Sequence, residues 1–157
     1  MRKIIYAIIS TLAALGICSA ATVTGRFRPI DLPTGKITSV FSIEQTPTGF
    51  VWMGTDDVLL RYDGYGYKTY RWAMDDSSSI ANNIINALEY CEDDGLLYVG
   101  TDTGVSIYDP LKDSFTTMPG TGGRHVKSFL VRDGRIFICT TTELLMYKDG
   151  IAVPVIK

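Results

Sequence analysis

The sequence is short of the residues from which most catalytic and metal centres are built. It has one histidine and three cysteines among 157 residues. A single histidine supplies no metal cluster, so His125, beside a glycine-rich stretch, is interpreted as a solvated loop residue. The acidic runs at 56–57, 75–76 and 92–94 lack the alternating spacing of a calcium loop and are interpreted as turns. We therefore expect no catalytic residue, no metal and no cofactor in this chain.

Basic clusters and long apolar runs are also scarce. The formal net charge is −2 and no group of Lys and Arg forms a stripe, which argues against a nucleic-acid partner. The one long apolar run, 4–17, follows Met-Arg-Lys and precedes the small residues Cys-Ser-Ala-Ala. It is shorter than the ~20 residues of a usual membrane span. It predicts a signal peptide over 1–20, with a retained anchor as the alternative, and hence an exported, periplasmic chain without a membrane span after cleavage.

Cleavage would leave only two cysteines, Cys91 and Cys139, in a compartment that permits disulfides. Each lies in an apolar, strand-like run, where a buried free thiol is the simpler interpretation. Free thiols are favoured over a bridge, because the sequence alone does not bring the two together.

Three copies of one pattern run through the rest of the chain. "VWMGTDDVLLRYDG" (51–64) matches "LYVGTDTGVSIYDP" (97–110) and "IFICTTTELLMYKD" (136–149) without a gap. The shared positions, an aromatic residue, a glycine, a threonine and a tyrosine, are interpreted as structural. They are Trp52, Gly54, Thr55 and Tyr62; Tyr98, Gly100, Thr101 and Tyr108; and Phe137, Thr140 and Tyr147. The third copy has Cys139 in the glycine position.

The pattern around each copy predicts strands. An apolar segment and a turn with Gly49, Gly95 or Gly134 precede it, and a second turn and a further short strand follow. Four antiparallel strands in ~40–46 residues are the spacing of a β-propeller blade. Residues 77–90 have some helical character, but their Ser and Asn residues favour a loop that leads into a strand. The fold class is therefore all-β, with about three four-stranded blades in an incomplete ring.

The expected organisation follows from these copies. Residues 21–37 form an N-terminal segment with a possible clasp strand, 38–72 the first blade, 73–119 a loop and the second blade, and 120–157 the third blade. Because propellers close with ~4–8 blades, we expect either a fragment of a longer protein, which is favoured, or a ring completed by other copies or a partner.

The sequence resembles the two-component regulator propeller repeat. The resemblance rests on "GFVWMGT", "LLRYDG" and "GLLYVGTDTGVSIYD" and covers about residues 26–155. Such repeats build the periplasmic sensor region of hybrid two-component histidine kinases in polysaccharide-degrading bacteria. The resemblance implies a sensor segment for a glycan-derived oligosaccharide, without the kinase and without catalysis by this chain. The alternatives are a self-assembling exported interaction module or, less favoured, an exported propeller enzyme.

Two tryptophans are the candidates for a sugar-stacking surface. Trp52 occupies a repeated position, which favours packing between blades. Trp72 lies outside the repeated positions, in an inter-blade loop, and is the weak candidate for ligand binding.

Overall fold

The computed structural model describes residues 29, 31–33 and 37–156, and within this part of the chain all regular structure is β. The predicted signal peptide, 1–20, lies outside the described residues, as does most of the predicted clasp segment, 21–37. The strands belong to the compact unit Leu32–Lys157. In the described part, no helix is long and apolar enough to cross a membrane.

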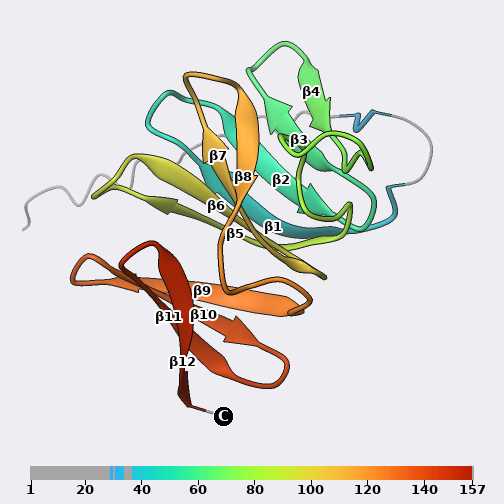
Figure 1. Cartoon of the computed structure of the whole chain (residues 1–157). Coiled ribbons are helices and arrows are strands. Elements are labelled where there is room, and N and C mark those ends of the chain that lie inside the picture. Colours follow the sequence, from blue (N-terminus) through green and yellow to red (C-terminus); the bar gives the residue numbers. More distant parts are fainter. Residues whose placement is uncertain (1–28, 30, 34–36, 157) are drawn as a thin grey trace, which may run out of the picture. The chain divides into compact units, whose positions relative to one another are not determined.

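The strands form three separate four-stranded antiparallel sheets (Figure 1). Blade 1 contains β1 (Val40–Gln45), β2 (Val51–Thr55), β3 (Leu59–Tyr62) and β4 (Tyr67–Tyr70). Blade 2 contains β5 (Ile85–Cys91), β6 (Leu96–Thr101), β7 (Gly104–Asp109) and β8 (Ser114–Thr117). Blade 3 contains β9 (Val126–Arg132), β10 (Arg135–Thr140), β11 (Leu144–Lys148) and β12 (Ile151–Ile156). The predicted all-β class and the three blades of an incomplete ring are confirmed.

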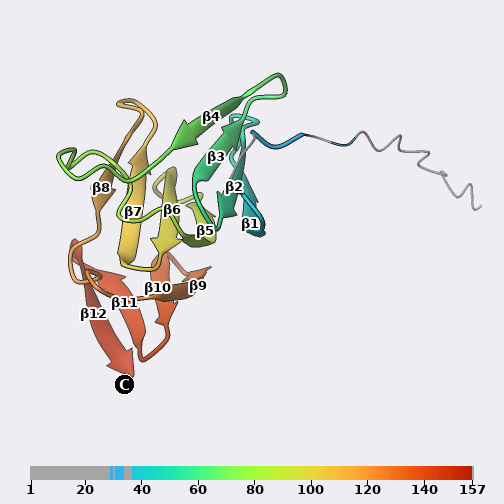
Figure 2. The same ribbon diagram turned by 90° about the vertical axis from the view of Figure 1, so that its right-hand side faces the viewer.

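Each blade is a meander in which the first strand meets the neighbouring blade. β5 contacts β1 and β2, and β9 contacts β5 and β6. The predicted glycine turns between the first and second strands adopt positive φ, +88° at Gly49, +72° at Gly95 and +67° at Gly134. Residues 77–84 form the predicted loop, which leads into β5. Figure 2 shows this connection beside β8, where the Phe115 N–H donates to the Ser78 carbonyl at 2.8 Å.

The repeated threonine closes the turn between the second and third strands of each blade. Its hydroxyl donates to the carbonyl three residues later, over 2.7 Å from Thr55, 2.8 Å from Thr101 and 2.9 Å from Thr140. The same oxygen accepts backbone N–H groups of the turn, such as that of Thr103 at 3.2 Å. The position is repeated because a buried turn needs a side chain that both donates and accepts.

Thr101→Val is expected to lower the free energy of unfolding by about 1–3 kcal/mol, because valine keeps the shape but leaves buried backbone groups unpaired. Thr101 is fully buried. Thr116→Val, at an exposed position of β8, is the control and is expected to change stability by less than about 0.5 kcal/mol. Chemical denaturation of both variants measures the difference, and equal stabilities would contradict the role given to this hydroxyl.

The repeated aromatic residue packs onto the following blade. Trp52 is 1% exposed and lies in a cluster with Ile85 and Tyr108 of blade 2; its ring centroid is 4.7 Å from that of Tyr108. Tyr98, also 1% exposed, lies in the cluster that blade 2 forms with blade 3. Phe137 of blade 3 is only half-buried. Inter-blade packing therefore explains why this position is aromatic.

The repeated glycine makes room for the first strand of the next blade. A Cβ at Gly54 would lie 2.7 Å from Cγ2 of Ile85 on β5, and one at Gly100 would lie 2.6 Å from Cγ1 of Val126 on β9. Blade 3 has Cys139 at this position, and its side chain is exposed. The prediction that Cys139 is buried is therefore wrong, because its face of blade 3 lacks the cover that Gly54 and Gly100 have. Cys91 is buried, and both thiols are free, as predicted.

The described part of the N-terminal segment lies against blade 1. Leu32 and Ile37 pack on the cluster of Met53, Val58 and Leu60. Residues 31–33 and 37–39 form no strand. This part of the segment therefore covers part of the face of blade 1 that does not contact blade 2.

Candidate functional site

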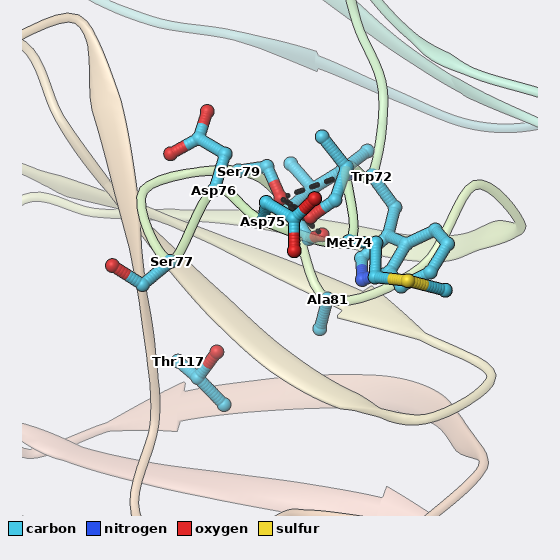
Figure 3. A pocket seen from close by; sticks show the side chains of 10 residues that line it. Trp72, Met74, Asp75, Asp76, Ser77, Ser79, Ala81 and Thr117 are labelled. Carbon is cyan, nitrogen blue, oxygen red and sulfur yellow. Dashed lines mark hydrogen bonds between the residues drawn. The ribbon is translucent and has the colours of Figure 1, made fainter.

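The loop between β4 and β5 carries the predicted ligand-binding residue. Trp72 is 47% exposed, and the neighbouring Met74 is 80% exposed. The backbone N–H of Trp72 donates to Oδ1 of Asn83 at 2.8 Å, which ties the start of the loop to its end. A cavity of about 370 Å³ lies over the loop and reaches Thr117 on β8. Figure 3 shows Trp72 and Met74 on one side of the loop and Asp76 and Ser77 on the other.

Local hydrogen bonds between side chains and backbone stabilise the shape of this loop. The Ser78 N–H donates to Oδ1 of Asp76 at 2.9 Å, and Oγ of Ser79 accepts the Ala73 N–H at 3.1 Å. The hydrogen bond to Ser78, chiefly from its hydroxyl, lowers the pKa of Asp76. Asp75–Asp76 thus acts in a turn, as the sequence indicated. The result is an open surface that pairs an exposed indole with hydroxyl and carboxylate groups, a combination suited to a polyhydroxylated ligand.

A second concentration of polar side chains lies where blade 2 meets blade 1. Asp113, in the turn between β7 and β8, accepts bonds from Tyr70 at 2.5 Å, from Tyr108 at 2.7 Å and from Arg61 at 3.2 Å. Lys68 donates to the other carboxylate oxygen of Asp113. Asp113 itself has a positive φ of +53°, an uncommon conformation for a residue with a side chain. These contacts join β3 and β4 of blade 1 to the outer turn of blade 2.

The network shifts the pKa values of Asp113 and Tyr70. Partial burial acts to raise the pKa of Asp113, but the bonds from Lys68, Tyr70 and Tyr108 and the charge of Arg61 outweigh it, and the pKa lies well below the usual range. Burial first, and then the bond to Asp113, raise the pKa of the Tyr70 phenol far above its usual range. Asp113 therefore stays an acceptor and Tyr70 a donor at neutral pH.

Asp113→Asn is expected to destabilise the fold by about 1–2 kcal/mol at pH 7, since it removes a carboxylate with four donors but in a site partly screened by solvent. The folded-state pKa is lowered, so the stabilisation is complete above the ordinary carboxyl pKa of about 4 and is lost as the pH falls through the folded-state value. The difference from the wild type should therefore shrink between pH 5 and about pH 2. Denaturant unfolding across this range measures it, and a difference that grows on acidification would contradict the assignment.

His125 lies closer to other groups than the sequence indicated. Its Nδ1 is 3.4 Å from Oδ1 of Asp102, and its Nε2 is 3.3 Å from Nδ2 of Asn86. Asn86 also donates to Asp102 at 2.8 Å. The ring is half-buried rather than fully solvated, and it links the start of β9 to β5 and to the turn between β6 and β7. In the described part of the chain, no three His, Cys, Asp or Glu residues are grouped for a metal ion.

The structure separates the predicted ligand-binding residue from the repeated positions. Trp72 lies in the exposed loop, whereas Trp52, Tyr98 and Tyr108 belong to the cores between blades. Sequence reasoning missed Asp113 as the centre of a network, because its partners in blade 1 are 43 to 52 residues away. The only signal was an acidic residue in a predicted turn.

The known proteins similar to this chain include a histidine kinase and extracellular domains of hybrid two-component systems. No protein-family model matches the chain. Over 55 residues it is 44% identical to the "Histidine kinase P4" of Formosa agariphila, a match that spans 35% of this chain and 4% of that protein. The chain is similar in structure to the extracellular domains of two B. thetaiotaomicron proteins described as hybrid two-component systems, BT4673 and BT3049, with a TM-score of 0.64 to each.

The structural matches establish the fold. Identity is 18% to BT4673 and 22% to BT3049, and the alignments cover 76% and 75% of this chain but only 16% and 18% of those proteins. The chain thus spans a small part of the relatives it matches. The described part therefore has the fold of these extracellular domains, and the 55-residue match to a histidine kinase agrees with the resemblance to the two-component regulator propeller repeat.

Proposed function

We propose that this chain forms part of the exported, periplasmic ligand-sensing region of a two-component sensor, and that its ligand is a glycan-derived oligosaccharide. The proposed sensory role rests on the fold of the described part. Its three blades have the fold of the extracellular domains of hybrid two-component systems. The proposal assigns no catalytic step to these residues. Phosphoryl transfer belongs to a kinase region, such as the one implied by the similarity to a histidine kinase.

The loop after β4 supports an oligosaccharide as the ligand. The ring of Trp72 is half-exposed, and apolar faces of sugar rings stack on such indoles. Polar groups of Asp75, Ser77 and Thr117 line the same cavity and can exchange hydrogen bonds with sugar hydroxyls. The cavity is open on one side, which suits a chain of sugar units rather than an enclosed small molecule.

Titration calorimetry of the whole chain with a panel of oligosaccharides from plant, algal and host polysaccharides tests this proposal. We expect one structural class to bind saturably, and Trp72→Ala to weaken its binding about fivefold to tenfold. Tyr65→Ala removes an aromatic ring that is 98% exposed outside the loop and is the matched control, with unchanged affinity. Failure of every oligosaccharide to bind, or equal losses in both variants, would contradict the proposal.

Self-association is the second candidate function, because both outer blades expose apolar side chains. On blade 1 these are Val40, Phe41 and Ile43, and on blade 3 they are Leu130, Ile151, Val153 and Val155. On blade 3 the pairing places Leu130, Phe137, Met146 and Val153 in one row across the sheet. Such faces suit further blades or other copies of the chain. Sedimentation velocity should then show discrete oligomers that Leu130→Asp dissociates, whereas a monomer at high concentration would exclude this function.

A further inference from the structure

A cavity of about 210 Å³ lies between blades 1 and 2, at the end opposite the threonine turns. Its walls are mainly aromatic and proline side chains: Pro47, Phe50, Trp52, Tyr90, Tyr108 and Pro110. Arg61 is the only charged residue among those that line it. The volume is below the ~300 Å³ at which cavities for drug-sized ligands begin, so the space suits a single ring.

Arg61 is held by hydrogen bonds through one nitrogen, and its other nitrogens remain available as donors. Its Nη1 donates to Oη of Tyr108 at 2.8 Å and to Asp113 at 3.2 Å. The guanidinium carbon lies 4.6 Å from the centre of the Phe50 ring. Nε and Nη2 of Arg61 make no hydrogen bond to any residue in the described part of the chain. A guanidinium fixed by one nitrogen presents its others in a preorganised geometry.

The indole N–H of Trp52 is a second donor without an acceptor. It is buried and finds no partner among the residues that the structure describes. A buried N–H without a partner is unfavourable and rare in folded proteins, so such a group calls for an explanation. At the equivalent position of blade 2, the hydroxyl of Tyr98 is satisfied by Oδ2 of Asp94 at 2.6 Å. Blade 1 has Thr48 where blade 2 has Asp94, so the aromatic residue that lines the cavity lacks this acceptor.

The corresponding cavity between blades 2 and 3 has a different character. Asp93, Asp94 and Asp149 line it together with Lys148 and Arg135. The position equivalent to Arg61 is Ile107 in blade 2 and Met146 in blade 3. The combination of apolar walls, one cation and an unpaired N–H is therefore specific to the first junction and is not a consequence of the repeat.

We propose that the cavity between blades 1 and 2 binds a small carboxylate carried on a single apolar ring. The carboxylate would accept from Nε and Nη2 of Arg61, while Phe50 and Tyr90 would contact the ring beside the indole of Trp52. A neutral sugar ring fits less well, because its several hydroxyls would meet mostly apolar walls and stay unpaired. This site is separate from the Trp72 loop and goes beyond the oligosaccharide proposed there.

Benzoate is the probe for this site, and the indole N–H signals of the whole ¹⁵N-labelled chain report its binding. The chain has two tryptophans, so Trp72 is an internal control. We expect a saturable shift of the Trp52 indole signal, because the benzoate ring would lie beside the indole that lines the cavity, and no shift of the Trp72 signal. Benzyl alcohol, which has the ring without the charge, should bind at least about tenfold more weakly.

Two arginine variants complete the test. Arg61→Gln should weaken benzoate binding at least about tenfold, since it removes a charge-assisted pair. Arg71→Gln, which removes an ion pair to Asp57 outside the cavity, should leave it unchanged. If Arg61→Gln fails to fold, Arg61→Lys takes its place. It keeps the charge but loses the two-pronged guanidinium, and should weaken benzoate binding by less than about tenfold. The proposal is overturned if benzoate does not shift the Trp52 signal, if a neutral monosaccharide shifts it instead, or if both glutamine variants bind alike.

Discussion

Replacing Trp52 by alanine is expected to lower the free energy of unfolding by about 3–5 kcal/mol, a large part of the stability of an ordinary domain. The ring is 1% exposed, stacks 5.6 Å from Tyr70 and meets Tyr108 edge-on. Removing it would leave a cavity in the core that joins blade 1 to blade 2, and strands already paired within each sheet cannot collapse to fill it. Denaturant unfolding followed by circular dichroism measures the loss.

Two variants separate the packing of Trp52 from other effects. Trp52→Phe keeps an aromatic ring and removes the unpaired indole N–H, so it should cost less than about 1.5 kcal/mol. Phe137→Ala removes the aromatic residue at the equivalent position of blade 3, where the side chain is only half-buried, and should cost about 1 kcal/mol. Equal losses of stability for Trp52→Ala and Phe137→Ala would show that the repeated aromatic residue does not stabilise the fold by packing on the following blade.

Gly100→Val is expected to destabilise the chain by about 3 kcal/mol, the upper end of the usual cost of overpacking. A Cβ at Gly100 would lie 2.6 Å from Val126 and 3.0 Å from the ring of Phe129, both on β9. Because β9 is the strand by which blade 3 meets blade 2, the added side chain would force the two blades apart. Thermal unfolding should show a lower midpoint.

The matched control uses the same position in the next blade. Cys139→Val introduces the same side chain where the face is exposed, and it should change stability by less than about 0.5 kcal/mol. A cost for Cys139→Val equal to that of Gly100→Val would mean that valine is disfavoured by the strand itself. A neutral Gly100→Val would mean that β9 does not approach β6 as closely as described.

The repeat predicted the blades because its positions have physical causes that recur. The threonine is needed by each turn, the aromatic residue by each inter-blade core and the glycine by each close approach of a following strand. Three copies in register therefore predicted strand number, turn positions and the burial of Trp52, and the structure confirms these.

The features that the sequence did not predict depend on contacts between blades or between loops, which no single copy of the repeat determines. Cys139 was predicted to be buried because it lies in an apolar, strand-like run, but such a run does not show whether the face of the strand is covered. The network around Asp113 joins residues of different blades, and its contacts depend on how those blades pack. Trp72 was placed correctly in a loop, but its cavity depends on the turn at Asp76 and on the nearby β8.

The most direct test of three blades packed in series is a nuclear Overhauser measurement on methyl-labelled protein. Contact is expected between a Val126 methyl and the α-protons of Gly100, and between the Cγ2 methyl of Ile85 and those of Gly54. Each pair joins successive blades at the repeated glycine. Strong cross-peaks for both pairs are the predicted result, and their absence with all four residues assigned would contradict the account.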